Sequence, residues 1–390
     1  MGKAGSKDTG GMSTYLRGLS GALAGKGHRV DIFTRQECAG EERVEQISPR
    51  VRIISIDDGQ GMLDKYDIFP YSELLAKRIN DFRGRDKLRY DLIFSHYWVS
   101  GCVGRMLKES WGLPHLIMFH TLGIVKNEAC PGEAEPPVRL REEERLALEC
   151  EAVITAAQLE KDNVLRCFNL PAGRVKVIPS GVDRNLFNPE AENRVKLPFL
   201  KELLKDDYKI ILAVGRIEPV KGFELAVETL ALTAKTKKVR LLIAGGDGSS
   251  IKKVQSFIEK AEKLGVGDCL FFAGLVDHEQ MPFYYRAASA TIIPSFYESF
   301  GLTALESVAC GTPFVASPVG VMPELFDKGK QTGAAGHLVE GRNPTLWADA
   351  LQKILSQSIP LGASEISYLM EPYDWDKIAD SFVDHILQLK

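Results

Sequence analysis

The chain has 390 residues, of which 45% are hydrophobic and 26% are charged, and its formal net charge is −3. This length predicts two domains, each able to bury a core of its own. The near-neutral charge gives no electrostatic reason to expect nucleic-acid binding, and no apolar run reaches the roughly 18 residues of a membrane span. Seven scattered cysteines without a C-x-x-C pair argue against zinc and indicate a reducing, cytoplasmic location.

The first half of the chain alternates between helical and strand patterns. Apolar residues recur at helical spacing over 12–23, and the next strand is predicted at 29–34. Further strands are predicted, with helices between them, at 51–56, 91–95, 116–120, 152–155 and 175–178. This alternation predicts an α/β fold with a parallel, doubly wound sheet.

The second half repeats the alternation. Its strands are predicted at 209–214, 239–244, 270–273, 290–293 and 313–316. The stretch between Pro189 and Asp207 is charged and polar, so we place the linker there. We therefore expect a first domain over 1–188, a second over 189–374, and a final helix over 375–390, where apolar residues again recur at helical spacing.

The stretch 294–306 is the most informative about chemistry, because it follows a predicted strand and opens a helix. Free amides at a helix N-terminus bind anions, and Gly301 would let a phosphate approach the backbone closely. Glu298 and Glu306 lie eight residues apart, which predicts two carboxylates on a similar side, roughly 12 Å apart along the axis. Such carboxylates accept paired hydrogen bonds from vicinal hydroxyls, so the pattern fits two hydroxyl-rich groups joined by a diphosphate. The alternative is an acid that stabilises the helix dipole, with Glu306 solvated.

Two other loops add to this interpretation. Arg216 and Lys221 follow the strand 209–214, where open α/β sheets bind ligands, and together they could neutralise a diphosphate leaving group. Gly10 and Gly11 open the first helix and form a second anion-binding geometry. Taken singly, each loop is equally compatible with an ordinary surface.

Together these features resemble the family 4 glycosyltransferases, retaining enzymes of the GT-B fold in which two Rossmann-like domains face a cleft. The resemblance covers nearly the whole chain. The matching motifs are Gly10-Gly11, Phe119-His120-Thr121, P-S-G-V-D at 179–183, Gly215-Arg216 with Lys221-Gly222, Gly245-Gly246, and the pair Glu298 and Glu306.

The resemblance implies a nucleotide-sugar donor, a UDP-sugar by family habit, that carries a hexose or N-acetylhexosamine. In the family, the residues matching Arg216 and Lys221 hold the donor diphosphate, so neither a metal nor another cofactor is expected. The residue matching Glu306 binds the ribose, and the one matching Glu298 contacts the transferred sugar. The implied catalytic residues are Arg216, Lys221, Glu298 and His120. The implied donor-binding residues are Gly10, Gly11, Arg216, Lys221, Glu298, Phe300, Gly301, Leu302, Thr303 and Glu306.

Within the family, the chain is most similar to the group that contains the mycothiol-pathway inositol-phosphate N-acetylglucosaminyltransferases and the sucrose-phosphate synthases. The motif H-T-L-x-x-V-K-N of that group spans 120–127. The similarity implies a small phosphorylated acceptor such as inositol phosphate, with its phosphate held by Lys65, Tyr97, Thr121 and Arg139. Ser13 stands where the group has an Asn against the inositol ring, which leaves the identity of that ring open. The alternatives are transfer to fructose 6-phosphate and a non-catalytic nucleotide-sugar sensor.

The same resemblance carries two structural expectations. The final helix should pack back on the first domain. Family members begin with a strand before the diglycine, whereas only seven residues precede Asp8 and they are not strand-like. Either the start is truncated or the first strand is missing, and in both cases the first sheet is expected to lack its central strand. A homo-oligomer stays open, while nucleic acid and a transmembrane segment are not expected.

Overall fold

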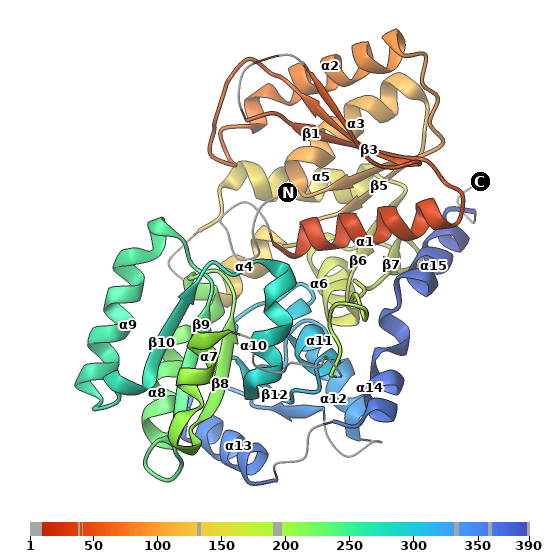
Figure 1. The fold of residues 1–390 in the computed structure, drawn as a ribbon. Coiled ribbons are helices and arrows are strands. Elements are labelled where there is room, and N and C mark those ends of the chain that lie inside the picture. Colours follow the sequence, from red (N-terminus) through yellow and green to blue (C-terminus); the bar gives the residue numbers. More distant parts are fainter. Residues whose placement is uncertain are drawn as a thin grey trace. The chain divides into compact units, whose positions relative to one another are not determined.

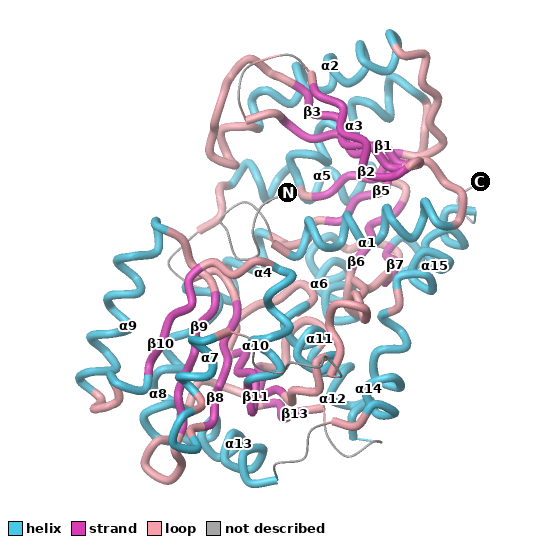
Figure 2. Tube along the Cα trace, in the orientation of Figure 1, coloured by secondary structure: helices cyan, strands magenta, loops and turns pink. Residues whose placement is uncertain are grey.

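The computed structural model describes residues 10–37, 40, 42–130, 134–189, 197–330, 335–357 and 361–387. The chain groups into two units. The N-terminal unit comprises Tyr15–Pro179 with Trp375–Lys390, and the C-terminal unit comprises Ser180–Asp374 with Met1–Thr14. Figures 1 and 2 show strands at the centre of each unit with helices around them. Among the described residues, no helix is both long enough and apolar enough to cross a membrane.

In its described part, the C-terminal unit is built on a six-stranded sheet in the order β10-β9-β8-β11-β12-β13, and each neighbouring pair is parallel. The strands are β8 (Lys209–Val214), β9 (Val239–Ala244), β10 (Leu270–Gly274), β11 (Ala288–Ile293), β12 (Phe314–Ala316) and β13 (Gly336–Leu338). Helices cover both faces of a parallel sheet, so its strands are continuous apolar runs. In β8, accordingly, Ile210, Leu212 and Ala213 are all fully buried.

The strand order reverses beside β8, and this reversal locates the candidate site of the C-terminal unit. From β8 the sheet continues through β9 to β10, and then the chain crosses to β11 on the other side of β8. Open α/β sheets bind ligands at the carboxyl ends of their strands, where the order reverses. The loops that follow β8 and β11 carry Arg216 and Glu298, so both residues lie at this point.

The helices of the C-terminal unit are α7 (Pro198–Leu203), α8 (Phe223–Thr233), α9 (Ile251–Lys263), α10 (Met281–Ala287), α11 (Leu302–Ala309), α12 (Met322–Lys330), α13 (Pro344–Gln357) and α14 (Ala363–Met370). Helix α7 falls inside the stretch expected to be linker, because Leu200 and Leu203 give it a buried apolar side. Residues 190–196 of that stretch lie outside the described part. The segment before them groups with the C-terminal unit, since Arg286 Nε donates to the carbonyl oxygen of Asn188 at 2.6 Å.

The described part of the N-terminal unit contains two sheets. The first has the order β1-β3-β2 and the second the order β4-β5-β6-β7. Their strands are β1 (Val30–Arg35), β2 (Arg43–Ser48), β3 (Val51–Ile56), β4 (Ile93–His96), β5 (His115–Met118), β6 (Ala152–Thr155) and β7 (Val175–Val177). Strand β2, which we did not predict, is antiparallel to β3 and has no buried residue. The prediction that no strand precedes the diglycine concerns residues 1–9, which lie outside the described residues.

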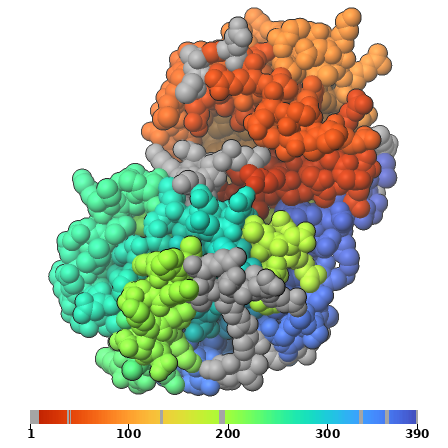
Figure 3. Space-filling model, in the orientation of Figure 1, coloured from red at the N-terminus to blue at the C-terminus, as the bar shows by residue number. Residues whose placement is uncertain are grey.

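The helices of the N-terminal unit are α1 (Gly11–Gly25), α2 (Ser72–Arg85), α3 (Trp98–Trp111), α4 (Gly123–Ala129), α5 (Pro137–Glu149), α6 (Gln158–Phe168) and α15 (Trp375–Leu387). The last of these, α15, lies alongside α1 (Figures 1 and 3). The rings of Trp375 and Tyr15 have centroids 5.9 Å apart, and Lys26 Nζ lies 2.6 Å from an Asp380 carboxylate oxygen. Gly18 makes this approach possible, because a Cβ there would lie 2.0 Å from the Trp375 ring.

Candidate active site

The loops after β8 and β11 are joined by an ion pair at the reversal of strand order. Lys221 ends the 3-10 helix η4 (Pro219–Lys221), and its Nζ lies 2.6 Å from Glu298 Oε1. Ser295 Oγ donates to the same oxygen at 2.7 Å. The next residue, Gly222, has φ +66°, and a Cβ there would lie 2.1 Å from the Pro294 carbonyl oxygen. A glycine is therefore required for the two loops to approach this closely.

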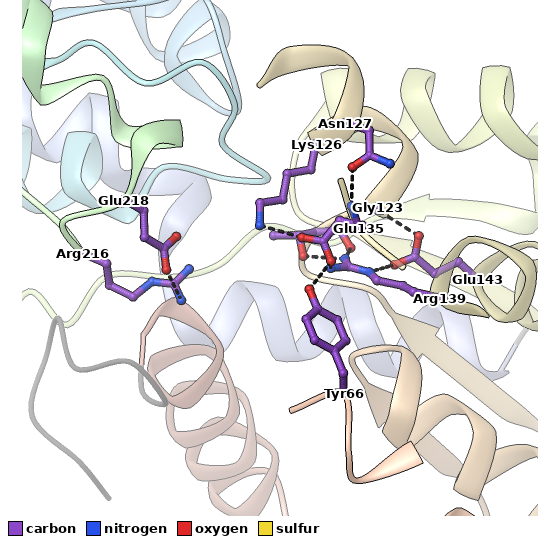
Figure 4. Close-up of polar contacts among 10 residues, drawn as sticks. Tyr66, Gly123, Lys126, Asn127, Glu135, Arg139, Glu143, Arg216 and Glu218 are labelled. Carbon is purple, nitrogen blue, oxygen red and sulfur yellow. Dashed lines mark hydrogen bonds and ion pairs between the residues drawn. The ribbon is translucent and has the colours of Figure 1, made fainter. Parts of the chain in front are cut away.

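Arg216 lies on the same loop after β8 and is more accessible than Lys221. Its Nη1 is 3.0 Å from Glu218 Oε1, and its side chain is 40% exposed. Figure 4 shows this pair. The predicted cations are thus both present at the carboxyl end of β8, and each has a carboxylate beside it. A carboxylate in this position can hold a cation in place until an incoming anion binds.

Helix α11 begins at Leu302, with Gly301 as its N-cap at φ +106°. A Cβ at Gly301 would lie 2.6 Å from Met322 Sδ, so the close approach of α12 also requires glycine. Thr303 lies in the first turn, whose backbone amides have no partner within the helix. Because Glu298 precedes this helix, only part of the interval to Glu306 is helical. The separation of roughly 12 Å along the axis, which treats all eight residues as helical, stays a prediction.

Glu306 is buried, with 8% of its surface exposed, so the alternative of a solvated Glu306 is wrong. Tyr285 OH donates to Oε2 at 2.7 Å, and His278 Nε2 lies 3.2 Å from Oε1. Burial and the nearby Glu306 carboxylate raise the pKa of Tyr285 well above its usual value, so the phenol remains a hydrogen-bond donor. These two partners fix the position of the carboxylate.

A cavity of about 430 Å³ lies at the carboxyl ends of β9 and β10. The glycine pair Gly245 and Gly246 lines it together with apolar side chains that include Ile251 and Phe272. Gly245 has φ +131°, and a Cβ there would lie 1.9 Å from the Gly215 carbonyl oxygen. The glycine thus brings the loop after β9 against the loop that carries Arg216. The apolar wall suits a flat ring rather than a phosphate.

In the N-terminal unit, two residues at the ends of adjacent strands adopt a strained backbone. Tyr97 follows β4 with φ +75°, and His120 lies just past β5 with φ +59°. Neither is glycine, and such conformations persist at sites where the surroundings impose them. Strand β5 ends at Met118 rather than at the predicted residue 120.

His120 is paired with a second histidine, His96, which the sequence analysis did not single out. His96 Nδ1 and His120 Nε2 are 2.8 Å apart. Burial lowers the pKa of His120 to about 3, and burial together with His120 lowers the pKa of His96 well below its usual value. Both imidazoles are therefore neutral near pH 7. The Tyr15 ring packs against both, with centroid distances of 5.7 and 5.9 Å.

Two of the predicted acceptor residues, Tyr97 and Thr121, lie against a third, Arg139, which is buried on α5 with 1% of its surface exposed. Its Nη2 donates to the Thr121 carbonyl oxygen at 2.7 Å and to Thr121 Oγ1 at 2.9 Å. Its guanidinium carbon is 5.0 Å from the centroid of the Tyr97 ring. Lys65 Nζ lies 4.7 Å from the centroid of the Tyr66 ring. Ser13 groups with the other unit.

The sequence analysis missed the carboxylates that hold Arg139 (Figure 4). Nε donates to Glu143 Oε1 at 2.6 Å, and Nη1 donates to Glu135 Oε2 at 2.7 Å. Lys126 Nζ lies 2.6 Å from Glu135 Oε1, and Tyr66 OH donates to Oε2. We call Tyr66, Thr121, Lys126, Glu135, Arg139 and Glu143 the Arg139 network. The spacing of four between Glu135, Arg139 and Glu143 could have indicated it.

Glycine at 123 allows α4 to pack against this network. A Cβ there would lie 2.7 Å from Leu140 Cδ2 and 3.2 Å from Arg139 Nε. The Gly123 amide donates to Glu143 Oε2 at 2.8 Å, so Glu143 is bound on both oxygens. Burial opposes ionisation of Glu135, but Arg139 and Lys126 outweigh it and lower its pKa to about 2.

Comparison with known proteins agrees with this arrangement. The chain matches the family model described as Glycosyltransferase Family 4 over residues 9–186, and the one described as Glycosyl transferases group 1 over 198–368. The D-inositol 3-phosphate glycosyltransferase of Mycolicibacterium smegmatis is 34% identical over 90% of this chain and 80% of its own. Its counterpart in Xylanimonas cellulosilytica is 32% identical over 97% of this chain and 92% of its own.

Among solved structures, sucrose-phosphate synthase from Thermosynechococcus elongatus is 30% identical and has a TM-score of 0.87. That match covers 100% of this chain and 96% of the synthase. Sequence and fold similarity thus extend across both units, and the resemblance inferred from the motifs is confirmed. The chain belongs to the family 4 glycosyltransferases and has the GT-B fold.

Proposed function

We propose that this glycosyltransferase moves a hexose or N-acetylhexosamine from a UDP-sugar to a hydroxyl of a small phosphorylated acceptor such as inositol phosphate. The transfer proceeds with retention and without a metal ion. The observation that carries the proposal is the buried pairing of Arg139 with Thr121 beside Tyr97, because guanidinium and hydroxyl groups bind a phosphate monoester. The D-inositol 3-phosphate glycosyltransferases among the relatives support it. The N-terminal unit binds the acceptor and the C-terminal unit the donor.

The donor site follows from the loops at the carboxyl edge of the C-terminal sheet. Glu306 accepts the ribose hydroxyls, since its carboxylate is already held in place by His278 and Tyr285. The apolar cavity beside Gly245 and Gly246 takes the base. The first turn of α11, which contains Leu302 and Thr303, faces the diphosphate together with the preceding Phe300 and Gly301, and Glu298 contacts the sugar.

The chemistry is loss of the nucleoside diphosphate followed by attack of the acceptor on the same face. The bond from the anomeric carbon to the phosphate oxygen breaks, and the diphosphate keeps the electron pair. Arg216 and Lys221 neutralise the charge that develops there, which is the role a metal would otherwise fill. The acceptor oxygen then bonds to the anomeric carbon, and its proton passes to the departing phosphate. His120, neutral near pH 7, accepts a hydrogen bond from a hydroxyl or donates one to it.

An acceptor competition tests the proposal. Each UDP-sugar is offered with inositol phosphate and fructose 6-phosphate, each beside its unphosphorylated parent, and released UDP is measured. We expect a phosphorylated acceptor to be preferred by at least about a hundredfold, as expected when a buried charged site loses its partner. Preference for a neutral parent would overturn the acceptor assignment. Fructose 6-phosphate is the second candidate, because the match to sucrose-phosphate synthase is close over the whole chain.

Thr121→Val is the sharper variant for this site. Arg139→Ala would remove the cation paired with the buried Glu143 and leave Glu135 with Lys126 alone, and so would test folding. Thr121→Val removes only the hydroxyl, while the Thr121 carbonyl oxygen still binds Arg139 Nη2. We expect a higher KM for the phosphorylated acceptor, an unchanged KM for the donor, and full activity with EDTA present. The anomeric configuration of the product, read by proton NMR, tests retention.

A further inference from the structure

Arg139 and Lys126 already bind an anion in this structure, and that anion is the carboxylate of Glu135. Lys126 Nζ contacts Oε1 at 2.6 Å, while Arg139 Nη1 and Tyr66 OH both donate to Oε2. The Glu135 side chain is 2% exposed. Its backbone amide donates to Asn127 Oδ1 at 2.7 Å, which fixes the main chain at this point. Figure 4 shows the carboxylate enclosed by these groups.

The charges of the Arg139 network balance without any ligand. The cations Arg139 and Lys126 are matched by the carboxylates Glu135 and Glu143. The Arg139 side chain is 1% exposed, and its Nε, Nη1 and Nη2 all have acceptors. A phosphate added to this set would place one or two uncompensated negative charges in a buried site, at a large free-energy penalty. A phosphate can therefore reach Arg139 only when one of the carboxylates leaves.

Glu135 is the carboxylate able to leave. Glu143 lies within α5 and accepts hydrogen bonds from Arg139 Nε and from the Gly123 amide. Glu135 precedes the helix, which begins at Pro137, and its side chain is bound through side-chain donors. Those donors, an ammonium, a guanidinium and a phenol, are the groups that bind phosphate oxygens.

We propose that the Glu135 carboxylate stands where the acceptor phosphate binds and is displaced by it. This rests on the proposed phosphorylated acceptor. Glu135 then acts as a specificity residue: it keeps the cations in place in the empty enzyme and excludes groups that bind more weakly than a carboxylate. A neutral acceptor cannot displace it, whereas a phosphate brings more oxygens and more charge to the same donors.

Binding of inorganic phosphate, measured by calorimetry, tests the proposal without depending on turnover. Glu135→Gln removes the competing charge and keeps the volume, so we expect phosphate to bind about tenfold more tightly, a change of about 1.4 kcal/mol. Two matched controls separate displacement from net charge. Glu143→Gln removes the negative charge of a carboxylate that pairs with the same guanidinium, but it leaves Glu135 in place. Glu128→Gln removes a negative charge from the same helix as Lys126, at an exposed pair with Arg166 that is not part of the Arg139 network. Neither control should bind phosphate more tightly than the wild type.

Glu135→Asp provides a second route if Glu135→Gln does not fold. Its shorter carboxylate cannot bridge both cations, so phosphate affinity should lie between the wild type and the Gln variant. A folded Glu135 variant with wild-type phosphate affinity overturns the proposal, as does an equal gain in Glu143→Gln. If the wild type still prefers phosphorylated acceptors in that case, only the displacement idea has failed. If it prefers neutral acceptors and no variant binds phosphate, the proposed function fails with it.

Discussion

The ammonium nitrogen of Lys221 lies 2.6 Å from Oε1 of Glu298, and this pair joins the loops after β8 and β11 at the reversal of strand order. Both side chains are largely buried, at 19% and 15% exposed. A donor diphosphate that binds here meets a cation already oriented by a carboxylate, which reduces the reorganisation needed during the reaction.

Lys221→Ala should lower kcat by about 10²–10³-fold, because the lost charge meets the leaving group as its charge develops. The melting temperature should change little, since Ser295 Oγ still donates to Glu298. Steady-state kinetics and thermal unfolding measure the two effects. Lys205→Ala is the matched control: Lys205 is exposed and paired with Glu202 at 2.6 Å, and such surface pairs contribute about 0–1 kcal/mol. Full activity in a folded Lys221→Ala would rule out the leaving-group role.

Glu306→Gln should weaken UDP binding by about 1–3 kcal/mol, since a charged acceptor of the ribose hydroxyls becomes a neutral one. Gln is preferable to Ala because its amide oxygen can still accept the hydrogen bond that the buried Tyr285 OH donates to this residue. Calorimetry of UDP binding is the measurement. Glu259→Gln, on the exposed face of α9, should leave the affinity unchanged. Equal affinity in Glu306→Gln and the wild type would remove Glu306 from the ribose site.

Sequence patterns predicted this fold where apolar runs are buried on both faces. The ranges 152–155, 209–214 and 239–244 coincide with β6, β8 and β9. Strand β2 was missed because it is exposed, so its composition is not constrained by burial. The short helix α7 was missed because two leucines in a polar stretch are too few to show a helical period.

The candidate site was predictable only at the level of single residues. Motif positions placed Arg139 and Thr121 on separate elements, and the structure brings them into contact. The ion pair between Arg139 and Glu135 has a spacing of four residues, but Glu135 lies before α5, so the helical pattern alone does not place it. The left-handed backbone at His120 could not be located from the sequence, because His is enriched at positive φ but most histidines adopt other conformations.

The half-buried pair of His96 and His120 predicts a loss of stability in acid. In the folded state the pKa of His120 is about 3, whereas in the unfolded chain it is about 6.5. The contribution of His120 to the free energy of unfolding is complete above pH 6.5 and is lost as the pH falls toward 3, because over that range only the unfolded chain takes up the proton. From pH 6.5 to 5 this amounts to on the order of 2 kcal/mol. His96 acts in the same direction.

His120→Gln should therefore lose less stability between pH 7 and pH 5 than the wild type does. The comparison must be made between variants, because burial also raises the pKa of Glu160 to about 8, and that group becomes more stabilising as the pH falls. His28→Gln, an exposed histidine before β1, serves as the control and should keep the wild-type slope. Urea unfolding at several pH values gives the free energy of unfolding, and its slope against pH is compared between the variants. If the free energy of unfolding changed with pH equally in His120→Gln and in the wild type, His120 would not be held neutral in the folded state.

Two glycines on α1 should respond to the same substitution with opposite signs. Replacing a helical glycine by alanine stabilises a helix by about 0.5–1 kcal/mol when there is room for the methyl group. At Gly21 nothing lies within 4 Å of the added Cβ, so Gly21→Ala should raise the melting temperature. At Gly18 the Cβ would lie 2.0 and 2.1 Å from two atoms of the Trp375 indole. Gly18→Ala should therefore destabilise the protein by about 1–3 kcal/mol, since a rigid ring and its helix α15 must move. In a Trp375→Ala background the penalty of Gly18→Ala should disappear, because the ring that it would strike is gone. If Gly18→Ala were as stabilising as Gly21→Ala, α15 would not pack against α1 through this contact.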